Sequence, residues 1–192
     1  MIPYSRQTID EDDIAAVVSV LRSDWLTQGP TIAEFEKALA EYSGARFAVA
    51  APNGTAALYL AYKAAGLKEG DEIITVPNTF VATSNMALIC GANPVFCDIR
   101  SDTHNIDENK IEELITSKTK AIVPVHFAGH PCEMDKIMEI AKKHNLLVIE
   151  DACHAIGAKY KNKRIGGIGD LTVFSFHPVK PITTGEGGAI LT

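Results

Sequence analysis

The feature that most constrains the fold is a regular alternation of short apolar runs with longer, helix-length stretches. Seven runs have the length and composition of strands, at residues 47–51, 72–77, 94–99, 120–125, 146–150, 171–176 and 188–191. Helix-length stretches separate most of them, at residues 55–65, 80–90, 107–116 and 134–144. This alternation predicts an α/β fold with a central, mainly parallel seven-stranded sheet and helices on both faces.

The N-terminal part has a helical pattern of its own. Residues 10–23 predict an amphipathic helix with an acidic start, and a turn containing Gly29 and Pro30 follows it. A second helix is expected from Thr31 to Tyr42, before Gly44. We therefore expect an N-terminal helical segment at residues 1–30 and a main domain at residues 31–192.

Composition excludes several classes of function. The net charge is −6, with 24 acidic and 18 basic residues, and no basic cluster points to a nucleic-acid partner. No apolar stretch approaches the ~20 residues of a membrane span, and the polar start does not resemble a signal peptide. The histidines lack zinc-type spacing, so we expect no metal. Four cysteines without CxxC spacing are typical of reduced thiols in a cytoplasmic protein: Cys90, Cys97, Cys132 and Cys153.

The segment after the sixth predicted strand carries a candidate for covalent chemistry. Lys180 lies between Pro178 and Pro181, five residues after Ser175 and ahead of a loop with three glycines and one acid. A lysine constrained in this way could form a Schiff base with a carbonyl cofactor. The alternative is an ordinary exposed loop lysine, which is the commoner role of this residue type.

The fifth predicted strand ends in two acids that favour the functional interpretation. Residues 146–149 are apolar, as in a strand buried on both faces, and Glu150 and Asp151 follow directly. Ligands bind at the carboxyl ends of strands in a parallel sheet. An acid there could hold a proton on the ring nitrogen of pyridoxal, although either acid could instead cap the next helix.

Other strands end in further candidate ligands. Residues 53–55 lead into an alanine-rich helix whose free N–H groups could hold a phosphate, although a plain N-cap is the commoner role. Phe80 follows the second strand and could stack on a flat ring or belong to the core. A phosphate seat, a ring platform, Asp151 and Lys180 at one edge of the sheet together predict a pyridoxal 5′-phosphate (PLP) site.

These motifs resemble the DegT/DnrJ/EryC/StrS family of sugar aminotransferases, which have the fold-type-I architecture of PLP-dependent transferases. The resemblance covers the whole chain and rests on residues 24–30, 54–57, 79–80, 124–129, 150–155 and 174–180. It implies an enzyme whose PLP-binding large domain is residues 31–192, with residues 1–30 forming a helix and a segment through which substrate enters. Family members continue with a small C-terminal domain, so we expect this chain to be truncated.

The resemblance also implies a role for each candidate residue. Lys180 would carry the Schiff base and move a proton, Asp151 would keep the pyridine nitrogen protonated, and His154 would face the ring. His154 could instead be a helix-start histidine with a local partner. The other expected cofactor contacts are Gly54, Thr55, Phe80 and Ser175. The expected contacts to the nucleotide sugar are Tyr4, Asp24, Trp25, Leu26 and Thr27.

Within the family, the start of the chain and residues 183–188 look most like the pseudaminic-acid branch. That branch moves an amino group from glutamate to C4 of a UDP-linked 4-keto-6-deoxy-N-acetyl sugar, in homodimers with the active site at the interface. Alternatives are another nucleotide-linked ketosugar, or a catalytically incomplete or non-catalytic binding protein. A sibling dehydratase branch has histidine in place of Lys180, and a nicotinamide-binding fold would need a GxGxxG turn that is missing here.

Overall fold

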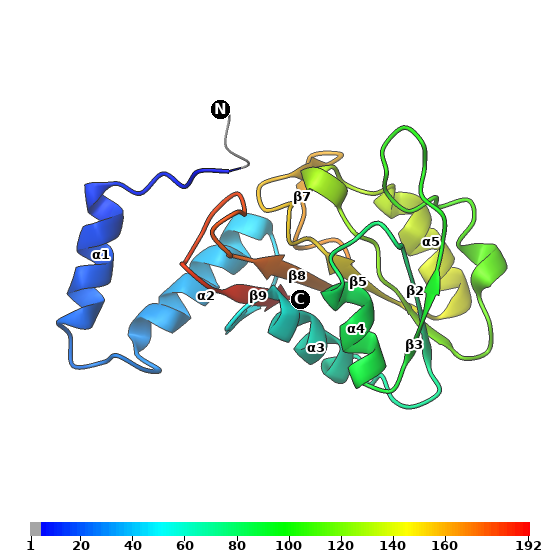
Figure 1. Ribbon diagram of the computed structural model, residues 1–192, viewed down its shortest axis with the longest axis horizontal. Helices are drawn as coiled ribbons and strands as arrows, with labels where there is room; N and C mark the ends of the chain where they lie inside the picture. The colour runs from blue at the N-terminus through cyan, green and yellow to red at the C-terminus, as the bar shows by residue number, and fades with distance from the viewer. Residues whose placement is uncertain (1–4) are drawn as a thin grey trace.

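The computed structural model describes residues 5–192 and shows a seven-stranded sheet covered by helices (Figure 1). The strands of this sheet are β1 (Ala48–Ala51), β2 (Glu72–Thr75), β3 (Asn93–Phe96), β4 (Thr119–Ile122), β5 (Leu147–Asp151), β8 (Leu171–Ser175) and β9 (Gly188–Leu191). The helices are α1 (Glu11–Leu21), α2 (Pro30–Ser43), α3 (Gly54–Ala64), α4 (Ala82–Ile89) and α5 (Met134–His144). The predicted α/β fold is confirmed, and each predicted strand has its counterpart.

The strand order places the functional ends together. The order is β1-β9-β8-β5-β4-β2-β3, with β9 antiparallel to both neighbours and every other pairing parallel. Since β1 and β8 both run opposite to β9, the carboxyl ends of β1, β2, β4, β5 and β8 share one edge of the sheet. Ligands in open α/β sheets bind at this edge.

Alternating side chains on the strands form a core on each face of the sheet. Ile73, Val123 and Ile149 are fully buried in the cluster that contains residues of α3 and α4. Their neighbours Ile74 and Val148 point the other way, into the cluster formed with α5. On that same face, α2 packs over the β8–β9 side of the sheet. The helices therefore lie on both faces, as predicted.

Local signals set the helix ends that matter for the site. The Asn53 side chain accepts a hydrogen bond from the Ala56 N–H at 2.8 Å, which fixes the start of α3 directly after β1. Gly44 ends α2 in a left-handed conformation with φ of 74°, and Asn145 does the same for α5 with φ of 55°. These two C-terminal caps end α2 before β1 and α5 before β5.

The predicted helix at residues 107–116 is wrong. This segment consists of turns and a single 3₁₀ turn, η1 (Glu112–Leu114). The Asp107 carboxylate accepts a hydrogen bond from the Asn109 N–H at 3.1 Å, a local turn that competes with a helical start. Ile115 then returns to extended backbone geometry, which ends the 3₁₀ turn.

A small hairpin of β6 (Lys159–Tyr160) and β7 (Lys163–Arg164) was not predicted. Its two turn residues, Lys161 and Asn162, have positive φ values of 45° and 69°, as a type I′ turn requires. The asparagine was the only sequence signal for this turn, and lysine is an unusual partner for it.

The N-terminal helix is separate from the sheet. α1 lies at the far left of Figure 1, and none of its residues is buried by the rest of the described chain. Within residues 5–192, no helix combines the length and the apolar character needed to cross a membrane.

Candidate active site

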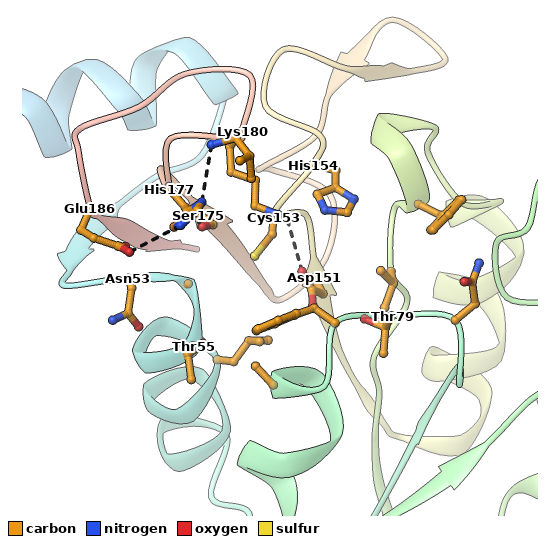
Figure 2. Close-up of a pocket in the computed structure, with 18 residues that line it drawn as sticks. Asn53, Thr55, Thr79, Asp151, Cys153, His154, Ser175, His177, Lys180 and Glu186 are labelled. Carbon is orange, nitrogen blue, oxygen red and sulfur yellow. Dashed lines mark hydrogen bonds and ion pairs between the residues drawn. The ribbon is translucent and has the colours of Figure 1, made fainter. Parts of the chain in front are cut away.

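A cavity of about 580 Å³ lies at the carboxyl edge of the sheet. Every predicted cofactor residue lines it: Gly54, Thr55, Phe80, Asp151, His154, Ser175 and Lys180. Figure 2 shows Asn53 and Thr55 at the start of α3, Thr79 across the pocket, and Lys180 on the loop after β8. Four separate chain segments thus converge on one space, as the strand order requires.

The start of α3 forms a seat for an anion. The Asn53 side chain occupies the Ala56 N–H, and the N–H groups of Gly54 and Thr55 have no acceptor within residues 5–192. A Cβ on Gly54 would lie 2.8 Å from the Ser175 Cβ, so only glycine lets this serine approach the helix end. Free N–H groups, the positive end of a helix and a hydroxyl group suit a phosphate.

Asp151 lies at the base of the cavity and is held by two donors. Its Oδ2 accepts a hydrogen bond from the Thr83 hydroxyl at 2.7 Å, and its Oδ1 accepts one from the Cys153 N–H at 3.2 Å. The residue is only 4% exposed. Sequence analysis missed Thr83, because the contact joins residues 68 positions apart and no local pattern marks it.

Glu150, the other candidate acid, has a structural role. Its Oε2 lies 2.8 Å from the His126 Nε2, and both side chains are completely buried. Its Oε1 accepts hydrogen bonds from the Gly169 N–H and the Thr172 hydroxyl. Glu150 points to the opposite face of β5 from Asp151, so the structure resolves which of the two acids faces the cavity.

The Lys180 ammonium group lies close enough to His154 to shift the pKa of the imidazole. Burial is the larger cause and Lys180 the second, and both lower the pKa of His154, whereas Asp151 raises it to a smaller extent. His154 is therefore neutral near pH 7. The Lys180 backbone is fixed by a turn in which its N–H donates to the His177 carbonyl at 2.9 Å. His177 also lies 3.8 Å from Glu186 across the mouth of the cavity.

The Phe80 side chain lines the cavity and is 68% exposed. A phenylalanine this exposed at a pocket wall is not a core residue, which removes the alternative left open by the sequence. A second cavity of about 400 Å³ adjoins the first and shares Phe127, His154, Val179 and Lys180 with it. Lys180 thus lies where the two cavities meet.

The predicted sugar contacts are placed elsewhere. The four at positions 24–27 follow α1 and are exposed, with Trp25 at 61% and Leu26 at 69%, and none of them lines the cavity. Tyr4 lies outside the described residues. Their contact with substrate stays a prediction. Among residues 5–192, no three His, Cys, Asp or Glu side chains are grouped as metal ligands would be.

Comparison with known proteins decides the family. Residues 7–192 match the DegT/DnrJ/EryC1/StrS aminotransferase family. The chain belongs to this family. A UDP-4-amino-4,6-dideoxy-N-acetyl-beta-L-altrosamine transaminase of Campylobacter jejuni is 50% identical over 195 residues, covering all of this chain and 51% of the relative. GDP-perosamine synthase of Caulobacter vibrioides is 48% identical, covering all of this chain and 52% of the relative.

Solved structures agree with this assignment. Helicobacter pylori PseC, an aminotransferase involved in the biosynthesis of pseudoaminic acid, superposes with a TM-score of 0.94 at 44% identity. Spr1654 from Streptococcus pneumoniae, solved in its PLP form, superposes with a TM-score of 0.95 at 37% identity. In both cases 99% of this chain and 52% of the other are covered. The chain spans about half the length of the curated relatives it matches.

Proposed function

We propose that this chain binds PLP and carries the catalytic lysine of a nucleotide-sugar aminotransferase. The amino group would pass from glutamate to the C4 keto group of a UDP-linked 4-keto-6-deoxy-N-acetyl sugar, on the route to pseudaminic acid. The observation that supports this most is the convergence of Lys180, Asp151, Phe80 and the start of α3 on one cavity. Membership of a sugar aminotransferase family supports it independently.

The residues in the cavity fit PLP group by group. The free N–H groups at the start of α3 and the Ser175 hydroxyl would bind the phosphate. Phe80 would cover one face of the ring, and Asp151 would hold a proton on the ring nitrogen. When bound, PLP supplies an electron sink for charge that develops on the carbon next to the transferred nitrogen.

Lys180 would attach the cofactor covalently and then act as the group that moves a proton. His154 is neutral at pH 7, because burial and Lys180 lower its pKa, so it adds no second positive charge beside the lysine. A neutral imidazole could donate one hydrogen bond and accept another at the edge of the ring.

The acceptor sugar is proposed from the relatives. Two Campylobacter jejuni transaminases named for the UDP-linked altrosamine product are 50% and 47% identical to this chain. GDP-perosamine synthase is 48% identical, which makes a GDP-linked ketosugar the second candidate. Similar overall identities to the two kinds of relative do not separate a UDP-linked from a GDP-linked substrate. The test below therefore compares both substrates directly.

We also propose a homodimer in the cytoplasm, with a second copy covering an apolar surface beside the cavity. The exposed apolar side chains of this surface are Leu60, Val81, Leu88, Ile89 and Phe96, each at least 43% exposed. They come from α3, from α4 and the residue before it, and from the end of β3, and α4 packs against both α3 and β3. Exposed apolar patches mark protein interfaces. In such a dimer the segment at residues 24–27, which does not line its own cavity, would contact substrate in the partner's.

The proposed reaction is tested on the PLP-loaded protein in its full natural length, supplied with glutamate and a panel of ketosugars. The panel contains UDP-linked 4-keto-6-deoxy-N-acetyl sugars and a GDP-linked 4-keto-6-deoxy sugar, and mass spectrometry detects the amino product. We expect amination of a UDP-linked substrate, its loss in Lys180→Ala and its retention in Lys142→Ala, since Lys142 lies on α5 away from the cavity. Amination of only the GDP-linked substrate would favour the second candidate, and no amination of any would contradict the proposal.

A further inference from the structure

The hydroxyl groups of Thr79, Thr83 and Tyr62 form a hydrogen-bonded set with Asp151, and Thr79 also lines the cavity. The Thr83 hydroxyl is 2.7 Å from the Asp151 Oδ2, and the Thr79 hydroxyl is 2.8 Å from that of Thr83. The Tyr62 hydroxyl donates to the Thr83 carbonyl at 2.8 Å. Thr83 and Tyr62 are both completely buried. None of these hydroxyl groups has a role in the function proposed above.

The direction of the hydrogen bonds follows from the donor count. A threonine hydroxyl has one hydrogen, and that of Thr83 has three possible acceptors: the Asp151 Oδ2 at 2.7 Å, the Thr79 hydroxyl oxygen at 2.8 Å and the Phe80 carbonyl at 3.1 Å. Hydrogen bonds to an ionised carboxylate are shorter and stronger than those to a neutral carbonyl. The hydrogen of Thr83 therefore points to Asp151, and Thr79 donates to the oxygen of Thr83.

The backbone around Thr83 ties this support to the rest of the site. The Thr83 N–H donates to the Phe80 carbonyl at 3.1 Å, so the residue that supports Asp151 and the exposed ring of Phe80 belong to one turn. Tyr62 anchors that turn to α3, whose first residues form the anion seat. Burial raises the pKa of Tyr62 well above its usual value, which keeps its hydroxyl a donor at all working pH values.

We propose that Thr83 is the positioning residue for Asp151, and that the Thr79–Thr83–Asp151 chain sets how strongly this carboxylate holds the proton of the cofactor ring nitrogen. The inference rests on the proposed function, because it needs PLP in the cavity. A carboxylate whose oxygen accepts a hydrogen bond from a buried hydroxyl group cannot rotate freely. The Cys153 N–H restrains the other oxygen at 3.2 Å, so the plane of the carboxylate is fixed at both ends.

Three variants separate positioning from stability. Thr83→Val removes the hydroxyl at nearly constant shape, and Thr83→Ser keeps the hydroxyl while removing a methyl group. Thr75→Val is the matched control, because the Thr75 hydroxyl is also completely buried but donates to the Val123 carbonyl at 2.9 Å, within the sheet. Two properties are measured for each: the dissociation constant of PLP and the pH midpoint of the visible absorption band.

The band reports protonation of the nitrogen that joins Lys180 to the cofactor. A positive charge on the ring makes that nitrogen easier to deprotonate, and Asp151 maintains this charge. Without the Thr83 hydroxyl, the Asp151 carboxylate is less well oriented toward the ring nitrogen and holds the ring proton less well. The loss of positive charge from the ring raises the midpoint. The other titratable groups that act on or near Asp151 are Tyr62, Cys153, His154 and Lys180, and all of them are unchanged in the variants.

We expect Thr83→Val to bind PLP on the order of tenfold more weakly, the range for a lost hydrogen bond to a charged group, and to titrate at higher pH. Thr83→Ser and Thr75→Val should match the wild-type protein in both measurements. If Thr83→Val behaves like Thr75→Val in affinity and midpoint, the inference is wrong while the proposed function stands. If the wild-type protein gives no visible band with PLP, the proposed function fails and the inference fails with it.

Discussion

The buried pair of His126 and Glu150 gives the sharpest prediction about what holds the site in place. The Cys132 N–H donates to the His126 Nδ1 at 3.1 Å, so the imidazole proton lies on Nε2 and is donated to Glu150. The His126 N–H donates to the Asp151 carbonyl at 3.1 Å, which links this pair to the backbone of the site acid. Glu150→Gln tests the arrangement with almost no change in volume.

Glutamine at position 150 cannot make all the hydrogen bonds that Glu150 makes. Its amide oxygen can still accept from the Gly169 N–H and the Thr172 hydroxyl, which leaves its NH₂ group facing the His126 Nε2 hydrogen. Moving the imidazole proton to Nδ1 would only transfer the conflict to the Cys132 N–H. One donor stays unsatisfied in a fully buried place, and a charge-assisted hydrogen bond is lost.

The free energy of unfolding should therefore fall by about 3 kcal/mol in Glu150→Gln, the range for breaking a buried hydrogen-bonded pair. In a domain of this size about 1 kcal/mol shifts Tm by roughly 2–4 °C, so we expect Tm to fall by roughly 6–12 °C. Differential scanning calorimetry and urea unfolding measure both quantities without any cofactor.

Glu112→Gln is the matched control. Glu112 also pairs with a histidine, His144, at 2.7 Å, but on the surface, where solvent screens the interaction. This variant should unfold close to the wild-type Tm. The reasoning is refuted if Glu150→Gln and Glu112→Gln have the same Tm, because the burial of the first pair would then have no energetic consequence.

Three other results follow from the structure. Gly54→Ala should weaken PLP binding by about five- to 150-fold in an absorbance titration, because the new Cβ would lie 2.8 Å from the Ser175 Cβ and overpacking the seat costs about 1–3 kcal/mol. Unchanged affinity would mean that the anion seat lies elsewhere. Phe80→Ala should lower PLP affinity with little change in Tm, since the ring is 68% exposed, and a large loss of Tm would assign it to the core instead. His154 has a pKa lowered by burial and by Lys180, so the unfolded state binds a proton more readily than the folded state. Stability should therefore fall as pH decreases through about 6.5, and His154→Asn should flatten this dependence in unfolding titrations.

The sequence predicted the parts of the fold that depend on local periodicity. Apolar runs bounded by turn residues predicted the strands, and the alternation of elements predicted that Asp151 and Lys180 would meet at one edge of the sheet. The helix expected at residues 107–116 was wrong, because side-chain hydrogen bonds of Asp107 to the following turn competed with helix formation.

The support of the site could not be predicted in the same way. Thr83 meets Asp151 across 68 residues, and His126 meets Glu150 across 24 residues, so each contact depends on strand order rather than on local pattern. Nothing in the adjacent residues Glu150 and Asp151 shows which acid faces the cavity. The pleat of β5 decides it, because successive side chains point to opposite faces. The family resemblance had already implied Asp151, and the assembled sheet supplies the physical reason.

The central claim is that Lys180 anchors PLP in this cavity. The most direct measurement is to add PLP, record the visible spectrum, reduce with borohydride and map the modified peptide by mass spectrometry. We expect a visible band that disappears on reduction, with the added mass on the peptide containing Lys180. The label should be lost in Lys180→Ala and kept in Lys142→Ala. A folded protein that gives no band, or a label that maps to another lysine, would contradict the account.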